Sequence, residues 1–228
     1  MGNWLFASGG ALIGLTLGYA LAYFGRILNF FLLDALFIGV LGGAAMLLWG
    51  LFLQIRPGRN LVIACMMLAC CAWFGQRGGD YRFALRAEIR NATSLLEEGR
   101  SAGLVDAEDL AQARREAKAS FQARLNESVG EEGIWGYTDH QWNQGVLLLR
   151  FATWSHKIPL PREAVIIGQM IATLMAFLLA WIVVRRLQWL PVCSGCGRPL
   201  SPMENAPDNP QPLGDTALCA TCSHSEKG

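Results

Sequence analysis

Four long apolar runs divide the chain, and each run predicts a helix that crosses a membrane. A crossing helix needs roughly 20 mostly apolar residues, because the hydrocarbon core of a bilayer is ~30 Å thick. The runs occupy residues 4–24, 29–53, 61–74 and 164–184. The third run is short, so it spans the bilayer only if flanking residues extend it or the bilayer thins around it. The pattern predicts a membrane-embedded body of about four helices.

The polar stretch between the third and fourth runs has the composition of a pair of helices. Residues 80–100 and 106–128 are rich in Ala, Leu, Glu and Arg and contain no proline, which favours helices. Asp106 stands where an N-cap of the second helix is expected. The segment SLLEEGRSAGLVDAEDLAQARREAKASF resembles the short helical-hairpin modules often attached to bacterial membrane proteins. This resemblance implies a helical hairpin outside the membrane.

Aromatic side chains gather in the segment after the predicted hairpin. They stand among glycines and an apolar run at residues 146–149, and they are Trp135, Tyr137, Trp142, Phe151 and Trp154. Trp and Tyr favour the headgroup layer of a membrane. We therefore interpret this segment as lying over the helix ends, with ligand binding as the lesser alternative.

One pair of side chains in the same segment has the chemistry of a general acid and base. His140 stands next to Asp139, and a second histidine, His156, follows at a distance. No nucleophile motif, zinc-protease motif or phosphate-binding loop stands near them. We therefore expect that the protein is not an enzyme.

Together these elements predict an all-α integral membrane protein. We expect three transmembrane helices in residues 1–75, the extramembrane hairpin and aromatic segment in 76–162, a fourth transmembrane helix in 163–186, and a small tail in 187–228. The composition agrees, since 53% of the residues are hydrophobic and only 16% are charged. A formal net charge of +1 produces no field that would attract nucleic acid, so we expect none as a partner.

Glycines recur at helical spacing in the first two runs. They leave one face of each helix nearly free of side chains, and they are Gly10, Gly14 and Gly18 in the first run and Gly39 and Gly43 in the second. Helix backbones approach closely along such faces. Two alternatives follow: packing within one chain, which we favour, or self-association and docking on another membrane subunit. The short connection between the two runs predicts an antiparallel hairpin.

Asp34 is the only acidic residue inside a predicted span. Ionisable groups inside a membrane are costly, and they often mark paths for ions or protons. Asp34 lies close to the start of its run, and no second acid, lysine or histidine stands inside the predicted spans. We therefore favour solvation at the interface or pairing with Arg26 over a role in transport.

The tail carries four cysteines at metal-binding spacing. Cys193 and Cys196 form one C-x2-C pair, and Cys219 and Cys222 form another after 22 intervening residues. This spacing favours a tetrahedral site of four thiolates, and it predicts structural Zn²⁺. A rubredoxin-like iron site and a dithiol redox pair are the alternatives. The segment between the pairs is rich in proline and polar residues, so bound metal would have to supply the folding free energy of the tail.

The first cysteine pair also carries a family resemblance. The segment CSGCGRPL resembles the first knuckle of zinc ribbons, and the resemblance covers about 30 residues of the tail. It implies that the four cysteines are the metal ligands and that the tail is a docking module. The second knuckle departs from the common pattern, because Ser223 rather than glycine follows its last cysteine.

Cysteine placement suggests the orientation of the chain. All seven cysteines lie in the third run, at Cys65, Cys70 and Cys71, or in the tail. Thiolates persist in reducing compartments, so we expect both termini in the cytoplasm and the chain in a bacterial inner membrane. The distribution of Arg and Lys near the span ends favours the opposite orientation.

From these features we expect a membrane scaffold or accessory subunit that docks a partner protein through its metal-stabilised tail. The bilayer and another protein subunit are the expected partners, and a homo-oligomer is possible within this class. Two alternatives stay open. One is a small oligomeric transporter or channel that uses Asp34, and the other is a membrane redox protein that uses the tail thiols.

Overall fold

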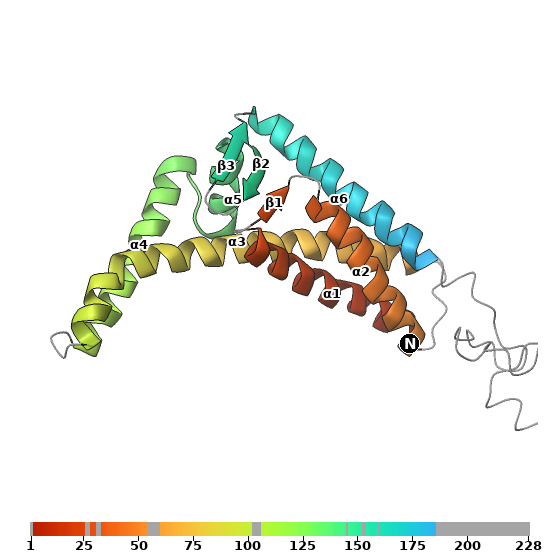
Figure 1. Cartoon of the computed structure of the whole chain (residues 1–228), viewed down its shortest axis with the longest axis horizontal. Coiled ribbons are helices and arrows are strands. Elements are labelled where there is room, and N and C mark those ends of the chain that lie inside the picture. The colour runs from red at the N-terminus through yellow and green to blue at the C-terminus, as the bar shows by residue number, and fades with distance from the viewer. Residues whose placement is uncertain are drawn as a thin grey trace, which may run out of the picture. The chain divides into compact units, whose positions relative to one another are not determined.

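The computed structural model describes residues 2–25, 28–30, 33–53, 60–101, 106–144, 146–151, 154–158 and 160–185. This part contains six helices and three short strands (Figure 1). The helices are α1 (Gly2–Phe24), α2 (Leu33–Phe52), α3 (Asn60–Ser101), α4 (Ala107–Val129), α5 (Gly133–Asn143) and α6 (Arg162–Arg185). The strands are β1 (Leu28–Phe30), β2 (Val146–Phe151) and β3 (Trp154–Ile158). The mainly helical architecture predicted from the sequence is confirmed.

Four of these helices are long and apolar enough to cross a membrane. They are Trp4–Phe24, Leu33–Phe52, Leu61–Arg100 and Arg162–Arg185. The count agrees with the four predicted spans. The second span begins later than its apolar run predicts, because residues Leu28–Phe30 form β1 and the helix starts only at Leu33.

Helix α3 joins two segments that the sequence pattern separates. It runs for 42 residues without interruption, so it contains both the third apolar run and the first helix of the expected hairpin. At 1.5 Å per residue its length is ~60 Å, about twice the thickness of a hydrocarbon core. The apolar run of α3 ends at Phe74, and the rest of the helix carries charged side chains.

A small antiparallel sheet is the element that the sequence pattern does not predict. Its strand order is β1-β2-β3, with Leu28 paired to Phe151 and Val146 paired to Ile158. The sheet is a small addition to the helical architecture. The apolar run at 146–149, which we interpreted as interfacial, begins β2.

The described elements form two compact units, and the boundaries between them fall inside helices. The first unit contains the start of α1, most of α2, the start of α3 and most of α6. The second contains the rest of α1 and α3, the beginnings of α2 and α6, and all of α4, α5 and the three strands. In α1 the division follows Leu15, and in α3 it follows Ala72.

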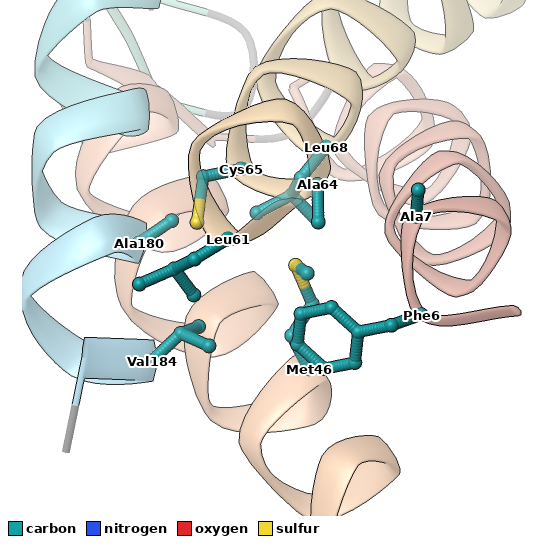
Figure 2. Packing of buried hydrophobic residues seen from close by; sticks show 9 residues of the cluster. All are labelled: Phe6, Ala7, Met46, Leu61, Ala64, Cys65, Leu68, Ala180 and Val184. Carbon is teal, nitrogen blue, oxygen red and sulfur yellow. The ribbon is translucent and has the colours of Figure 1, made fainter. Parts of the chain in front are cut away.

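The core of the first unit is formed by side chains from four helices (Figure 2). Phe6 of α1, Met46 of α2 and Val184 of α6 surround small residues of α3, and all three are at most 1% exposed. The full cluster is Phe6, Ala7, Met46, Leu61, Ala64, Cys65, Leu68, Ala180 and Val184. The indole N–H of Trp49, in α2, donates to the carbonyl of Leu5 at 3.3 Å. Helices α1 and α2 therefore pack antiparallel, as predicted.

The glycine faces pack against neighbouring helices of the same chain. A Cβ added at Gly10 would lie 2.6 Å from the carbonyl oxygen of Ala64, and one added at Gly14 would meet that of Leu68. A Cβ at Gly39 would lie 2.5 Å from Cβ of Leu179. The other two glycines of the predicted faces are buried as well, and they are Gly18 and Gly43. Packing within one chain, the alternative that we favoured, accounts for the glycines at 10, 14, 39 and 43.

We expect that Gly14→Ala lowers the thermal stability of the detergent-solubilised protein, because its methyl group would collide with backbone of α3. The matched control is Gly78→Ala in α3, where an added Cβ meets nothing within 4 Å. There the helix propensity of alanine should raise stability by up to ~1 kcal/mol. Thermal unfolding followed by circular dichroism measures both effects. Equal shifts for the two variants would contradict the close approach of α1 to α3.

Candidate functional site

A cluster of polar side chains lies where the apolar half of α3 ends. Asp34 stands in the first turn of α2, and the side-chain amide of Gln76 in α3 donates a hydrogen bond to its Oδ2 at 2.7 Å. A carboxylate in the first turn of a helix is also stabilised by the helix dipole. Asp34 is therefore held at the beginning of its helix by a partner 42 residues further along the chain.

Arg77, the next residue of α3, brings a positive charge to the same cluster. The residue is only 8% exposed, and its guanidinium lies over the ring of Trp73, 5.8 Å from the centroid. Its Nη1 lies 4.0 Å from Oδ2 of Asp80, one turn further along the helix. The charges of Asp80 and Asp34 both act on this guanidinium. Two carboxylates thus compensate one buried cation, which would otherwise be very costly to remove from water.

One donor in the cluster has no partner. Nε of Arg77 is buried and makes no hydrogen bond to any residue that the structure describes. An unpaired buried donor costs roughly 1–3 kcal/mol. The bonding of this cluster is therefore incomplete at Nε of Arg77.

Aromatic rings surround this end of the apolar run. Trp135 of α5 contacts Trp73 and Phe74 of α3, with ring centroids 6.2 Å and 6.1 Å apart. Trp135 is nevertheless 55% exposed, and Phe74 is 51% exposed. The predicted aromatic segment is in part a helix, α5, which packs on α4.

Helix α4 folds back along the polar half of α3 as the expected hairpin. Arg114 pairs with Glu97 at 2.9 Å, and Arg124 pairs with Glu88 at 2.5 Å, so the two helices run antiparallel. The buried side chains of α4 are Leu110, Ala117 and Leu125. Asp106 occupies the N-cap position, as predicted, but its side chain makes no capping hydrogen bond.

Two glycines make the turn from α4 into α5. Gly130, the C-cap of α4, has φ of 77°, and Gly133, the first residue of α5, has φ of 73°. Residues with a side chain are disfavoured in this left-handed region. The side-chain carbonyl of Gln122 accepts a hydrogen bond from the backbone N–H of Gly133 at 2.8 Å. The turn is thus fixed by backbone conformation and by one bond to the preceding helix.

The suggested acid and base at Asp139 and His140 have separate partners. The carboxylate of Asp139 accepts a hydrogen bond from the guanidinium of Arg162. Nδ1 of His140 lies 3.4 Å from the hydroxyl of Ser128, and its Nε2 lies 2.8 Å from the side-chain nitrogen of Gln144. Each of the two side chains therefore has partners other than its neighbour in the sequence.

The predicted zinc ligands lie outside the described residues, as does Arg26, the suggested partner of Asp34. The ligands are Cys193, Cys196, Cys219 and Cys222. Within the described part of the chain, no group of three or more His, Cys, Asp or Glu side chains could hold a metal ion. Of the α3 cysteines, Cys65 is buried and Cys70 is exposed. The four-thiolate site stays a prediction from the sequence.

Comparison with family models, curated proteins and solved structures found no match to this chain. The case for a function therefore depends on the geometry of the described residues and on the cysteine pattern of the tail.

The sequence analysis did not identify Gln76 and Arg77 as neighbours of Asp34. A local signal was present, since Arg77 and Asp80 are three residues apart and share a face of a helix. The pairing of Asp34 with Gln76 left no such signal, because it depends on how α2 and α3 meet. Close contacts between distant segments are set by packing rather than by spacing along the chain.

We expect a measurable coupling between Asp34 and Gln76. Asp34→Ala leaves the Gln76 amide without its acceptor and removes one of two charges that compensate Arg77, so it should destabilise the protein by ~1–3 kcal/mol. In a double-mutant cycle with Gln76→Ala, the coupling should be about 1 kcal/mol. Denaturant unfolding in detergent measures it.

Asp34→Asn is the matched control for this cycle, because an amide oxygen still accepts the bond from Gln76. It should cost less than Asp34→Ala. Strictly additive effects of Asp34→Ala and Gln76→Ala would show that the bond between them contributes nothing.

Proposed function

We propose that the chain is a membrane-anchored scaffold or accessory subunit. Four helices suited to crossing a membrane form the anchor, and the hairpin of α3 and α4 forms an arm outside it. In this proposal the protein assembles with other proteins and performs no chemical step itself. The chain lies in a bacterial inner membrane with both termini in the cytoplasm.

The continuity of α3 is the observation that supports this proposal most. One helix of 42 residues carries both the third apolar run and the outer hairpin, so a helical backbone rather than a linker connects them. Ion pairs at Glu88 and Glu97 and buried leucines of α4 keep α4 against this helix. A folded pair of helices offers a partner protein a surface of fixed shape, which is suited to docking.

The tail serves as the docking element in this proposal. Two C-x2-C pairs would bind one Zn²⁺ and give a short polar segment a fixed shape, because metal binding supplies its folding free energy. Four protein ligands leave no open position on the metal for water or substrate. The site would therefore act in recognition rather than catalysis.

The transporter alternative has less support than the scaffold. It requires a free face for oligomerisation, but Gly10 and Gly14 contact α3, and Gly39 and Gly43 contact α6. It then depends on Asp34 alone, which bonds to Gln76 at the beginning of its helix. Asp34→Asn separates the two proposals, because it would abolish flux in a transporter and leave a scaffold's complex intact.

We expect that the intact purified protein contains one zinc per chain and that Cys193→Ser/Cys196→Ser abolishes both the metal and the co-purification of a partner. Elemental analysis and affinity purification measure these two effects. The matched control, Cys70→Ser/Cys71→Ser, removes two thiols from α3 and should change neither. A partner retained by the metal-free variant would contradict the docking role of the tail. A visible iron chromophore or a reducible disulfide would instead favour the redox alternative.

A further inference from the structure

We propose that Arg82 and Arg86 of α3 bind the phosphates of anionic lipid headgroups. Both side chains are exposed, and they stand four residues apart, so they share one face of the helix. This lipid site is independent of the scaffold function and of the metal in the tail.

The depth of these residues follows from the end of α1. Its apolar run ends at Phe24, so this end of α1 lies at one surface of the bilayer. The rings of Tyr19 and Tyr23 contact Phe83 of α3, with centroids 5.5 Å and 5.8 Å apart. Phe83 is therefore at the same depth as the end of α1. Tyrosine rings at this level fit the aromatic layer between hydrocarbon and water.

Arg82 and Arg86 flank Phe83 along the same helix. At 1.5 Å per residue, Arg86 lies only ~5 Å further along the axis than Phe83. This distance is shorter than a Debye length of ~8 Å at physiological ionic strength, so the charge of a headgroup layer acts on both arginines. A third arginine, Arg90, continues the same face one turn further, where the field of the surface is weaker.

The two arginines carry charge that no ion pair within the described part of the chain neutralises. The acids closest in sequence have other partners, since Asp80 pairs with Arg77 and Glu88 pairs with Arg124. Neither Arg82 nor Arg86 forms an ion pair with a residue that the structure describes. A guanidinium can donate two parallel hydrogen bonds to a phosphate. At this depth the nearest abundant phosphates are those of the lipids.

A merely solvated basic face is the competing explanation, and depth distinguishes it from a lipid site. Arg115 and Lys118 of α4 are exposed and basic too. They lie between the residues that pair with Glu97 and Glu88, so they follow the more distant part of the hairpin. If the basic residues are merely solvated, both pairs should have the same effect on lipid binding. If a headgroup site exists, only Arg82 and Arg86 should contribute to the preference for anionic lipid.

Native mass spectrometry of the delipidated, full-length protein tests the proposal. The protein is titrated with phosphatidylglycerol or phosphatidylcholine, and the affinity for the first bound lipid is compared. We expect the wild type to prefer phosphatidylglycerol. Arg82→Gln/Arg86→Gln should reduce that preference by up to about fivefold per arginine, since one basic residue near a charged surface contributes ~1 kcal/mol.

Three comparisons complete the test. Arg115→Gln/Lys118→Gln removes the same charge from α4 and should keep the preference, and Arg82→Lys/Arg86→Lys should retain most of it. In the wild type, added salt should weaken the preference for phosphatidylglycerol. Intrinsic fluorescence measures this effect with the same lipids, and the measurement requires no variant. The proposal is overturned if the wild type binds both lipids equally, if the preference survives Arg82→Gln/Arg86→Gln, or if both glutamine variants lose it equally.

Discussion

Close approach of helix backbones is the constraint on which this fold depends. Between helices in a membrane the hydrophobic effect contributes little, because lipid chains are as apolar as leucine, and association depends on packing contacts. Glycines at 10 and 14 bring α1 onto α3, and glycines at 39 and 43 bring α2 onto α6. The core in Figure 2 correspondingly combines small residues, such as Ala64 and Ala180, with larger ones such as Phe6. The contacts between helices would be lost if these positions carried larger side chains.

At the polar cluster around Asp34, the kind of contact that α3 makes with its neighbours changes. Before the cluster α3 is apolar, and after it the helix carries charged side chains, of which Glu88 and Glu97 pair with α4. A buried arginine is tolerated there because carboxylates and an aromatic face compensate its charge. The same helix thus changes from dispersion contacts to ion pairs and aromatic contacts within a few turns. In the lipid site proposed above, Arg82 and Arg86 belong to this more polar part of the helix.

The sequence predicted the elements whose signals are local. The spans follow from uninterrupted apolar length, and α4 follows from composition and a correctly placed Asp106. The sheet was missed because β1 has three residues and because a short apolar run such as 146–149 does not distinguish a strand from other buried structure. The partner of Asp34 was missed for a different reason. Gln76 is 42 residues away, and no spacing rule links two helices that meet only after folding. The sequence pattern also separated the third span from the first helix of the hairpin, because it gave no sign that the helix continues through Gly78 and Gly79.

The turn between α4 and α5 shows how a position in contact with water can still resist change. An added Cβ at Gly130 or Gly133 would touch nothing within 4 Å, so sterics with neighbouring elements impose no limit there. The limit is torsional, because a left-handed residue with a side chain costs roughly 1–2 kcal/mol. Surface exposure alone would class both sites as freely variable. Their left-handed backbone angles instead make them points where the path of the chain depends on the absence of a side chain.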